Sequence, residues 1–527
     1  MTSIAAPIRA PSRVAPVPER VVLLHQHLQA SAGNAGEHCA IVSGGVRINY
    51  CVLARRVSQL AAALQAAGVQ RGDRVAVFMD NSVDFVVAVY AALQAGAVFM
   101  PINPLTKGDK LAYMLSDARA SVLVTEKGLG GVWRSAVAEV ASVQSVFVRE
   151  PSASDPRQRD WPADNGSSAT VRSAGLVDQD LAAIIYTSGS TGFPKGVMLT
   201  HLNMVSACWS VSTYLGYRGD DVVLCALPLA FDYGLYQVLM AVRVGATLVL
   251  ERGFTFPVKV LEVMARERCT VFPGVPTMFS MLMALKGLSQ FDLSALRMIT
   301  NTAAALSEGH IERLRALFPK AELFSMYGLT ECKRVTYLPP EQLDLRPTSV
   351  GRGMPNEEVW LVDEVGRRLP NGSTGELVIR GSNVMRGYWE KPEETAKRLR
   401  PGPFPGEMIL YSGDLFRTDN EGWLYFVARK DDIIKSRGEK VSPREVENAI
   451  HALDGVYEVV VIGVHDDVLG EAIKAFVVLK PEVQLTEREV IKHCLSRLES
   501  FMAPKHVEFV AELPKTDTGK IKKTGLV

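Results

Sequence analysis

The sequence has no excess of charge of either sign. Its 58 basic and 57 acidic side chains leave a formal net charge of +1, so it lacks the basic field that recruits nucleic acid or anionic lipid. We therefore expect no nucleic-acid partner. A hydrophobic content of 47% beside 22% charged residues is that of a globular protein, and 527 residues are enough for more than one domain.

Paired cysteines and long apolar runs are also missing. The seven cysteines form no CxxC pair, which argues against a zinc site or a disulfide framework and is typical of a reducing compartment. The most apolar stretch, Phe85–Ile102, contains Gln94 and Gly96 and predicts a helix and a short strand rather than a membrane span. We expect a cytoplasmic protein whose residues 1–20, rich in Ala, Pro and Arg, form a disordered leader.

Hydroxyls and glycines gather around one lysine in the segment Tyr186–Gly196 (YTSGSTGFPKG). Apolar runs on both sides predict a loop between two strands. Glycines let the backbone approach an anion, and amide and hydroxyl groups donate to it; a plain Gly/Ser-rich turn is the alternative. A Walker A loop is excluded because Lys195 is followed by Gly196 instead of Ser or Thr. The segment predicts a binding site for a nucleotide triphosphate.

Strand and helix patterns alternate over most of the chain, as in the predicted strand Arg74–Met79 and helix Asp84–Gln94. This alternation predicts an α/β fold of layered, mostly parallel sheets covered by helices. Short strands separated by Asn-Gly, Thr-Gly and Glu-Gly turns predict a small barrel-like β subdomain at about 350–430. We predict a large domain, 21–430, and a small mobile α+β C-terminal domain, 431–527.

Six motifs in one order give the chain a family resemblance from about Tyr50 to Lys520. They are Tyr186–Gly196, Tyr327–Glu331 (YGLTE), Gly375–Leu377 with Arg380–Gly381, Tyr411–Asp414 (YSGD), Arg429–Asp431 (RKD) and Leu513–Lys520 (LPKTDTGK). In this the chain resembles the adenylate-forming superfamily of acyl-CoA synthetases, amino-acid-adenylating domains and luciferases. The resemblance implies that a carboxylate attacks the α-phosphate of MgATP, giving an acyl-adenylate and pyrophosphate, and that a thiol then takes the acyl group.

The resemblance also implies roles for individual residues. Glu331, with Thr187, would hold Mg²⁺; a surface carboxylate is the alternative for Glu331. The residues that would bind ATP are Thr187, Ser188, Gly189, Ser190, Thr191, Gly192, Lys195, Ala303, Tyr327, Gly328, Thr330, Asp414, Phe426, Arg429 and Lys520. Among them Tyr327 would stack on adenine and Asp414 would accept both ribose hydroxyls, unless they are a core tyrosine and a turn residue.

Catalysis is implied for Lys520, Lys195, Thr187, Glu331 and Lys435. Lys520 would bridge the substrate carboxylate and the phosphates during adenylation. Asp431 would be the hinge about which the C-terminal domain rotates. Rotation of the C-terminal domain would withdraw Lys520 from the active site and bring Lys435 into it. It would also bring Gly438 and Glu439 to the channel through which the thiol enters.

The expected acid pocket departs from the family pattern. Thr302-Ala303-Ala304-Ala305 replaces the usual Gly-Gly-Ala-Pro, and we expect Phe231, Asp232, Thr302, Ala304 and Gly328 to contact the acid. Phe231-Asp232 resembles the pair in amino-acid-adenylating domains, where the aspartate binds the substrate ammonium. A buried carboxylate needs such a cation; alternatively, Asp232 caps a helix starting near Gly234.

The acyl acceptor is expected to be the phosphopantetheine thiol of a separate carrier protein or of CoA. The Phe-Asp pair slightly favours an amino acid loaded on a carrier protein. An acyl-CoA ligase for a fatty, aryl or other small acid is the alternative. A non-catalytic nucleotide-binding homologue and a luciferase-like oxygenase are alternatives of other classes.

Overall fold

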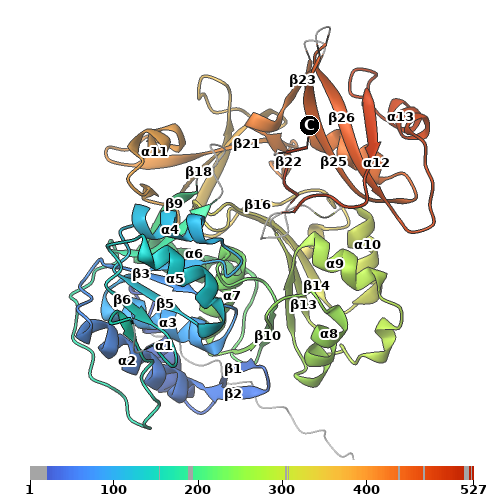
Figure 1. Cartoon of the computed structure of the whole chain (residues 1–527). Helices are drawn as coiled ribbons and strands as arrows, with labels where there is room; N and C mark the ends of the chain where they lie inside the picture. The colour runs from blue at the N-terminus through green and yellow to red at the C-terminus, as the bar shows by residue number, and fades with distance from the viewer. Residues whose placement is uncertain are drawn as a thin grey trace, which may run out of the picture.

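The computed structural model describes residues 21–152, 155–187, 194–302, 306, 308–436, 439–466, 469–515, 521–523 and 525–526, and of residues 431, 435, 440 and 470 the backbone only. The predicted leader, 1–20, lies outside the described residues. Four sheets organise the rest (Figure 1).

Two large mixed sheets carry most of the chain. The eight-stranded sheet has the order β19 (Gly387–Tyr388), β9 (Lys195–Thr200), β8 (Leu181–Thr187), β4 (Val98–Ile102), β3 (Arg74–Phe78), β5 (Val122–Thr125), β6 (Ser145–Phe147) and β7 (Gln158–Arg159). The nine-stranded sheet has the order β16 (Arg352–Gly353), β15 (Thr336–Leu338), β14 (Glu322–Tyr327), β13 (Met298–Asn301), β12 (Val271–Gly274), β10 (Val222–Cys225), β11 (Thr247–Leu250), β1 (Cys39–Ser43) and β2 (Val46–Asn49).

Two smaller sheets follow in sequence. The third contains β17 (Glu357–Val362), β18 (Thr374–Gly381), β20 (Leu399–Pro401), β21 (Met408–Thr418) and β22 (Leu424–Arg429), all antiparallel. The fourth contains β23 (Ile434–Ser436), β24 (Glu439–Val441), β25 (Val456–Asp466), β26 (Gly470–Leu479) and β27 (His506–Phe509). The 3-10 turn η4 (Lys430–Asp432) connects the two sheets, and Asp431 lies in it.

The helices alternate with the strands of the large sheets, as the sequence predicts. They are α1 (Gln26–Ala35), α2 (Tyr50–Ala66), α3 (Val83–Ala95), α4 (Gly108–Asp117), α5 (Gly130–Ala138), α6 (His201–Tyr214), α7 (Asp232–Val244), α8 (Pro257–Arg266), α9 (Pro276–Ala284), α10 (Glu308–Leu317), α11 (Pro392–Arg398), α12 (Pro443–His451) and α13 (Glu487–Leu495). Short 3-10 turns occur at η1 (Lys127–Leu129), η2 (Leu288–Gln290) and η3 (Pro340–Gln342). None of the helices in the described ranges combines the length and the apolarity that crossing a membrane requires.

The predicted α/β fold class is confirmed, with a difference in strand direction at the sheet edges. The strands β3, β4, β5 and β6 pair in parallel. In contrast, β8 and β9 pair antiparallel, as do β9 and β19. The loop between β8 and β9 is too short for a parallel crossover, which needs a dozen or more residues. The sheet edge with the predicted phosphate loop is therefore a hairpin.

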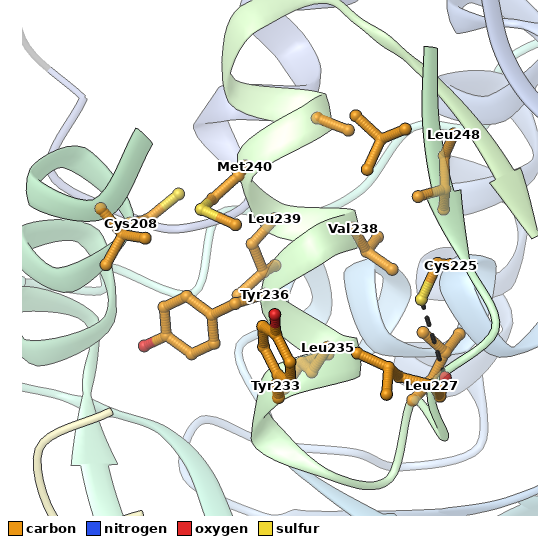
Figure 2. Close-up of a cluster of buried hydrophobic side chains, with 14 of the residues drawn as sticks. Cys208, Cys225, Leu227, Tyr233, Leu235, Tyr236, Val238, Leu239, Met240 and Leu248 are labelled. Carbon is orange, nitrogen blue, oxygen red and sulfur yellow. Dashed lines mark hydrogen bonds between the residues drawn. The ribbon is translucent and has the colours of Figure 1, made fainter. Parts of the chain in front are cut away.

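Helix α7 is buried along almost its whole length. It contacts α1, α6, β10 and β11, and its side chains pack into the cluster shown in Figure 2. Cys208 and Cys225 belong to this cluster, and burial raises the pKa of each thiol to about 12. Since the thiolate is the reactive form, these two cysteines are inert near neutral pH. The small fourth sheet has a separate apolar core that includes Val446, Val461 and Val490.

Gly234, in the first turn of α7, has no room for a side chain. A Cβ atom there would lie 2.3 Å from the carbonyl oxygen of Pro228, so Gly234→Ala should destabilise the protein by about 3 kcal/mol through overpacking. The thermal midpoint should fall. Gly309→Ala is the matched control, because a Cβ atom at Gly309 in α10 meets nothing within 4 Å. Equal midpoints for the two variants would contradict this packing.

Candidate active site

The predicted phosphate loop lies between two residues that are paired in the structure, Thr187 and Lys195. Thr187 ends β8, Lys195 begins β9, and the two residues are partners in the strand register. The loop residues Ser188, Gly189, Ser190, Thr191 and Gly192 lie outside the described residues. The hairpin thus closes the base of the loop, and its predicted role in binding phosphates stays a prediction.

Lys195 has two contacts that sequence patterns did not indicate. It forms an ion pair with Glu394 of α11, and its Nζ lies 5.5 Å from the centre of the Tyr388 ring. The hydrogen bond from Lys195, aided by Lys397, lowers the pKa of Glu394 to about 2. Glu394 is therefore ionised at neutral pH and holds the ammonium at the mouth of the hairpin.

Glu331 contacts the same tyrosine, Tyr388, through its side chain. The Tyr388 hydroxyl donates a hydrogen bond of 2.6 Å to Glu331 Oε1. Burial raises the pKa of Tyr388, so its hydroxyl remains a donor. The Met385 amide also donates to the Glu331 carbonyl oxygen at 2.7 Å. Strand β19 therefore brings the predicted metal ligand and the predicted phosphate-binding lysine together.

The donor set around Glu331 fits Mg²⁺ better than a metal caged by protein. Within the described ranges no three His, Cys, Asp or Glu side chains are grouped to hold a metal ion. Mg²⁺ typically takes one or two carboxylates and completes its shell with phosphate oxygens and water. One carboxylate, from Glu331, is consistent with that pattern.

Tyr327 and Asp414, the predicted adenine and ribose residues, are in direct contact. The Tyr327 hydroxyl donates a hydrogen bond of 2.6 Å to Asp414 Oδ2, and the Tyr327 ring packs edge-on against Phe416, with centroids 4.8 Å apart. Phe426 lies 6.2 Å from Tyr327. Arg429 Nε is 4.0 Å from Asp414 Oδ1. A carboxylate offers about four acceptor positions, so one bond from Tyr327 leaves capacity for hydroxyls of a ligand.

Burial raises the pKa of Asp414, while the Tyr327 hydrogen bond and the positive charge of Arg429 oppose that shift. Asp414 and Arg429 are register partners across β21 and β22. The pairing of these strands therefore places a cation beside the carboxylate that needs it.

Most of the predicted acid-pocket residues surround one small cavity. Its volume is about 30 Å³, and it is lined by Phe231, Asp232, Tyr233, Thr302, Gly328, Leu329, Thr330, Lys333 and Arg334. A Cβ atom at Gly328 would lie 2.5 Å from the carbonyl oxygen of Lys333, so glycine is required where the chain turns back. Ala303 and Ala304 lie outside the described residues.

Lys333 and Arg334 were missed by sequence patterns, although only Cys332 separates them from the YGLTE motif. Lys333 is buried, donates a hydrogen bond of 2.8 Å to the Asp232 carbonyl oxygen and lies 3.7 Å from Asp232 Oδ2. Its Nζ is 4.3 Å from the centre of the Tyr236 ring. Asp232 therefore already has a cationic partner within the chain.

The alternative that Asp232 caps a helix is wrong. Helix α7 begins at Asp232 itself, the N-cap position is Phe231, and no side chain makes a capping hydrogen bond there. The helix starts two residues before the predicted Gly234 because the chain reverses tightly between Pro228 and Phe231, where the Phe231 amide donates to the Pro228 carbonyl oxygen. Asp232 instead faces Lys333 in the cavity wall.

Two of the residues predicted to serve thioester formation, Lys435 and Glu439, lie on the fourth sheet. Lys435 and Glu439 belong to the hairpin of β23 and β24, whose main contacts are with β25 and β26 (Figure 1). Gly438 and Lys520 lie outside the described residues. Glu439 is not among the described residues that line the acid cavity.

The sheet topology is that of an adenylate-forming enzyme. The residues predicted to contact the nucleotide, such as Tyr327 and Asp414, and the acid cavity agree with this class. The chain belongs to the AMP-binding enzyme family, whose model matches residues 28–389; the model of the AMP-binding enzyme C-terminal domain matches residues 445–520.

Characterised relatives resemble the chain over nearly its full length. A long-chain-fatty-acid–CoA ligase of Bacillus subtilis is 32% identical over 97% of this chain and 96% of its own. A feruloyl-CoA synthase of an Amycolatopsis species is 35% identical over 92% and 94%. The crystal structure of ATP-bound MatB from Rhodopseudomonas palustris matches 96% of this chain and 98% of its own, with a TM-score of 0.85 and 30% identity. The chain is thus an ATP-dependent acid ligase.

The Tyr388 hydroxyl is predicted to position Glu331. Tyr388→Phe should lower the rate of ATP–pyrophosphate exchange roughly 10- to 100-fold and raise the Mg²⁺ concentration needed for half-maximal rate, as loss of a ligand's hydrogen-bond partner does. Tyr425→Phe is the control, since its hydroxyl donates to Asp419 away from the site. An unchanged Mg²⁺ requirement in Tyr388→Phe would refute the positioning role.

The buried Lys333 should make stability depend on pH. Burial lowers its pKa from 10.5 to about 7, partly opposed by Asp232. Between these values the unfolded chain binds more protons, so stability rises with pH across this window. From pH 7 to 9 the gain should be about 2.3 kcal/mol, since Lys333 is already half deprotonated in the folded chain at pH 7.

The measurement is the thermal midpoint at pH 7 and pH 9. It compares the natural chain with the Asp232→Asn/Lys333→Met double variant, which removes both charges together. The rise should be smaller in the variant. Identical pH dependence of the two proteins would show that Lys333 titrates normally.

Proposed function

We propose that the chain activates a small carboxylic acid as its acyl-adenylate and transfers the acyl group to the thiol of CoA. The observation that supports this choice is the contact of Lys333 with Asp232. A carboxylate already neutralised by a lysine has no need of a substrate ammonium. The two relatives that act on a long-chain fatty acid and on ferulate, a CoA ligase and a CoA synthase, agree with a CoA acceptor.

In the first half-reaction the substrate carboxylate attacks the α-phosphorus of ATP and pyrophosphate leaves. Lys195, Thr187 and the loop between them bind the leaving pyrophosphate, and Thr330 binds the α-phosphate. Tyr327, Phe426 and Arg429 contact the nucleoside, and Asp414 accepts the ribose hydroxyls. Mg²⁺ on Glu331 would supply charge stabilisation at the phosphates. Lys520 bridges the two reactants.

In the second half-reaction the CoA sulfur attacks the carbonyl carbon of the adenylate, a C–S bond forms and AMP leaves. Rotation about Asp431 replaces Lys520 by Lys435 and presents Gly438 and Glu439 to the pantetheine. The fourth sheet is suited to such a movement because it has its own apolar core.

An amino acid loaded on a carrier protein is the second candidate. It is favoured by the Asp232 carboxylate, which lines the acid cavity and carries the charge that an α-ammonium needs. For this substrate the ammonium would have to compete with Lys333 for Asp232.

Substitution of Asp232 separates the two candidates. In the CoA-ligase proposal, Asp232→Asn leaves Lys333 unpaired in the wall of the cavity. The rate of ATP–pyrophosphate exchange should then fall roughly 10- to 100-fold for amino and non-amino acids alike. A loss confined to amino acids would instead support the ammonium site. Both sets of acids are compared at equal chain length, and product thioesters are measured with CoA and with a phosphopantetheinylated carrier protein.

A further inference from the structure

Arg334 is a buried cation whose hydrogen-bonding edge has no partner. The residue is 1% exposed and lines the acid cavity. Within the described part of the chain, no acceptor meets its Nε or Nη2. Buried polar side chains are nearly always hydrogen-bonded, and an unpaired buried charge is the most costly exception. An orphaned guanidinium in a cavity wall therefore points to a ligand.

The two unpartnered nitrogens are the ones that bind a carboxylate. Nε and Nη2 present parallel N–H bonds along one edge of the guanidinium, and this edge accommodates the two oxygens of a carboxylate in a bidentate pair. The face of the guanidinium is occupied, since its central carbon lies 4.9 Å from the centre of the Tyr233 ring. A cation–π contact covers the face of an arginine but satisfies no N–H on its edge.

Three carboxylates in this part of the structure have partners of their own. Asp232 pairs with Lys333, Glu331 accepts from Tyr388, and Glu357 accepts a hydrogen bond of 2.8 Å from Asn383. The charged residues that line the cavity are Asp232, Lys333 and Arg334. Because Asp232 is paired with Lys333, no described carboxylate of the wall is left for Arg334.

We propose that the substrate carries a second carboxylate and that Arg334 binds it through Nε and Nη2. This deepens the proposed function and rests on it: the first carboxylate reacts with ATP beside Thr330, and the second is held by Arg334. Thr330 and Arg334 line the same small cavity, so the two carboxylates belong to a short chain. The substrate class is a short dicarboxylic acid, and Arg334 is the residue that selects it.

The first test uses the full-length natural chain and acids of matched length. ATP–pyrophosphate exchange is measured with succinate, butyrate and succinamate, and with glutarate, pentanoate and glutaramate. The amides keep the size of the second group and remove its charge. We expect kcat/KM for at least one dicarboxylate to exceed that of both matched acids about 100-fold. Equal use of butyrate and succinate would overturn the inference and leave the ligase function intact.

The second test substitutes the arginine. Arg334→Met should abolish the preference for the dicarboxylate over the monocarboxylate, and Arg334→Lys should keep part of it, because a lysine retains the charge without the bidentate edge. Arg243→Met is the matched control. Arg243 is also partly buried with an unpartnered Nε, but it lies in the last turn of α7 and donates to Ser212.

The control should keep the preference of the natural chain. A preference retained in Arg334→Met would overturn the inference. Should Arg334→Met fail to fold, as judged by its thermal midpoint, the substrate panel with the natural chain decides alone. Exchange with no acid of either kind, in a protein that still binds ATP, would overturn the ligase function together with this inference.

Discussion

The reversal of the chain from β14 into β15 is the constraint on which the site depends. It requires glycine at 328, because a Cβ atom would collide with the backbone of Lys333, and the Val335 amide closes the turn on the Tyr327 carbonyl oxygen at 3.0 Å. Within this turn the chain delivers Tyr327 to Asp414, Glu331 to Tyr388, and Lys333 and Arg334 to the acid cavity. The residues predicted to bind nucleotide, metal and acid therefore share one short segment.

Several ionisable groups of the site pair with a side chain from a distant segment. Lys195 pairs with Glu394, Asp232 with Lys333, and Asp414 with Tyr327 and Arg429. Pairing matters because charges removed from water are tolerated only when neutralised and hydrogen-bonded. Arg334 departs from this rule, since two of its nitrogens lack partners in the described part of the chain.

Local sequence patterns predicted the helices and strands well, but they did not predict which side chains pair across the fold. The predicted strand Arg74–Met79 is β3 to within one residue, and the predicted phosphate loop joins β8 and β9, because hydrophobic periodicity and turn residues act over a few positions. Phe231, Asp232, Thr302 and Gly328 meet at one cavity, as expected. Tyr388, Glu394 and Lys333 escaped prediction because their partners lie 57, 199 and 101 positions away. The hypothesis that Asp232 binds an ammonium correctly required a cation beside this carboxylate. It did not anticipate that Lys333 of the same chain lies there.

Strand β19 is only two residues long, yet its Tyr388 contacts both Glu331 and Lys195. Glu331 lies two positions before Lys333 and three before Arg334. A mutation that alters acid preference at these positions would therefore act on the backbone that sets the predicted metal ligand. Under the proposed function, specificity and turnover are pleiotropic in this chain: a lineage that changes its acid would have to recover its rate by compensating substitutions around Tyr388.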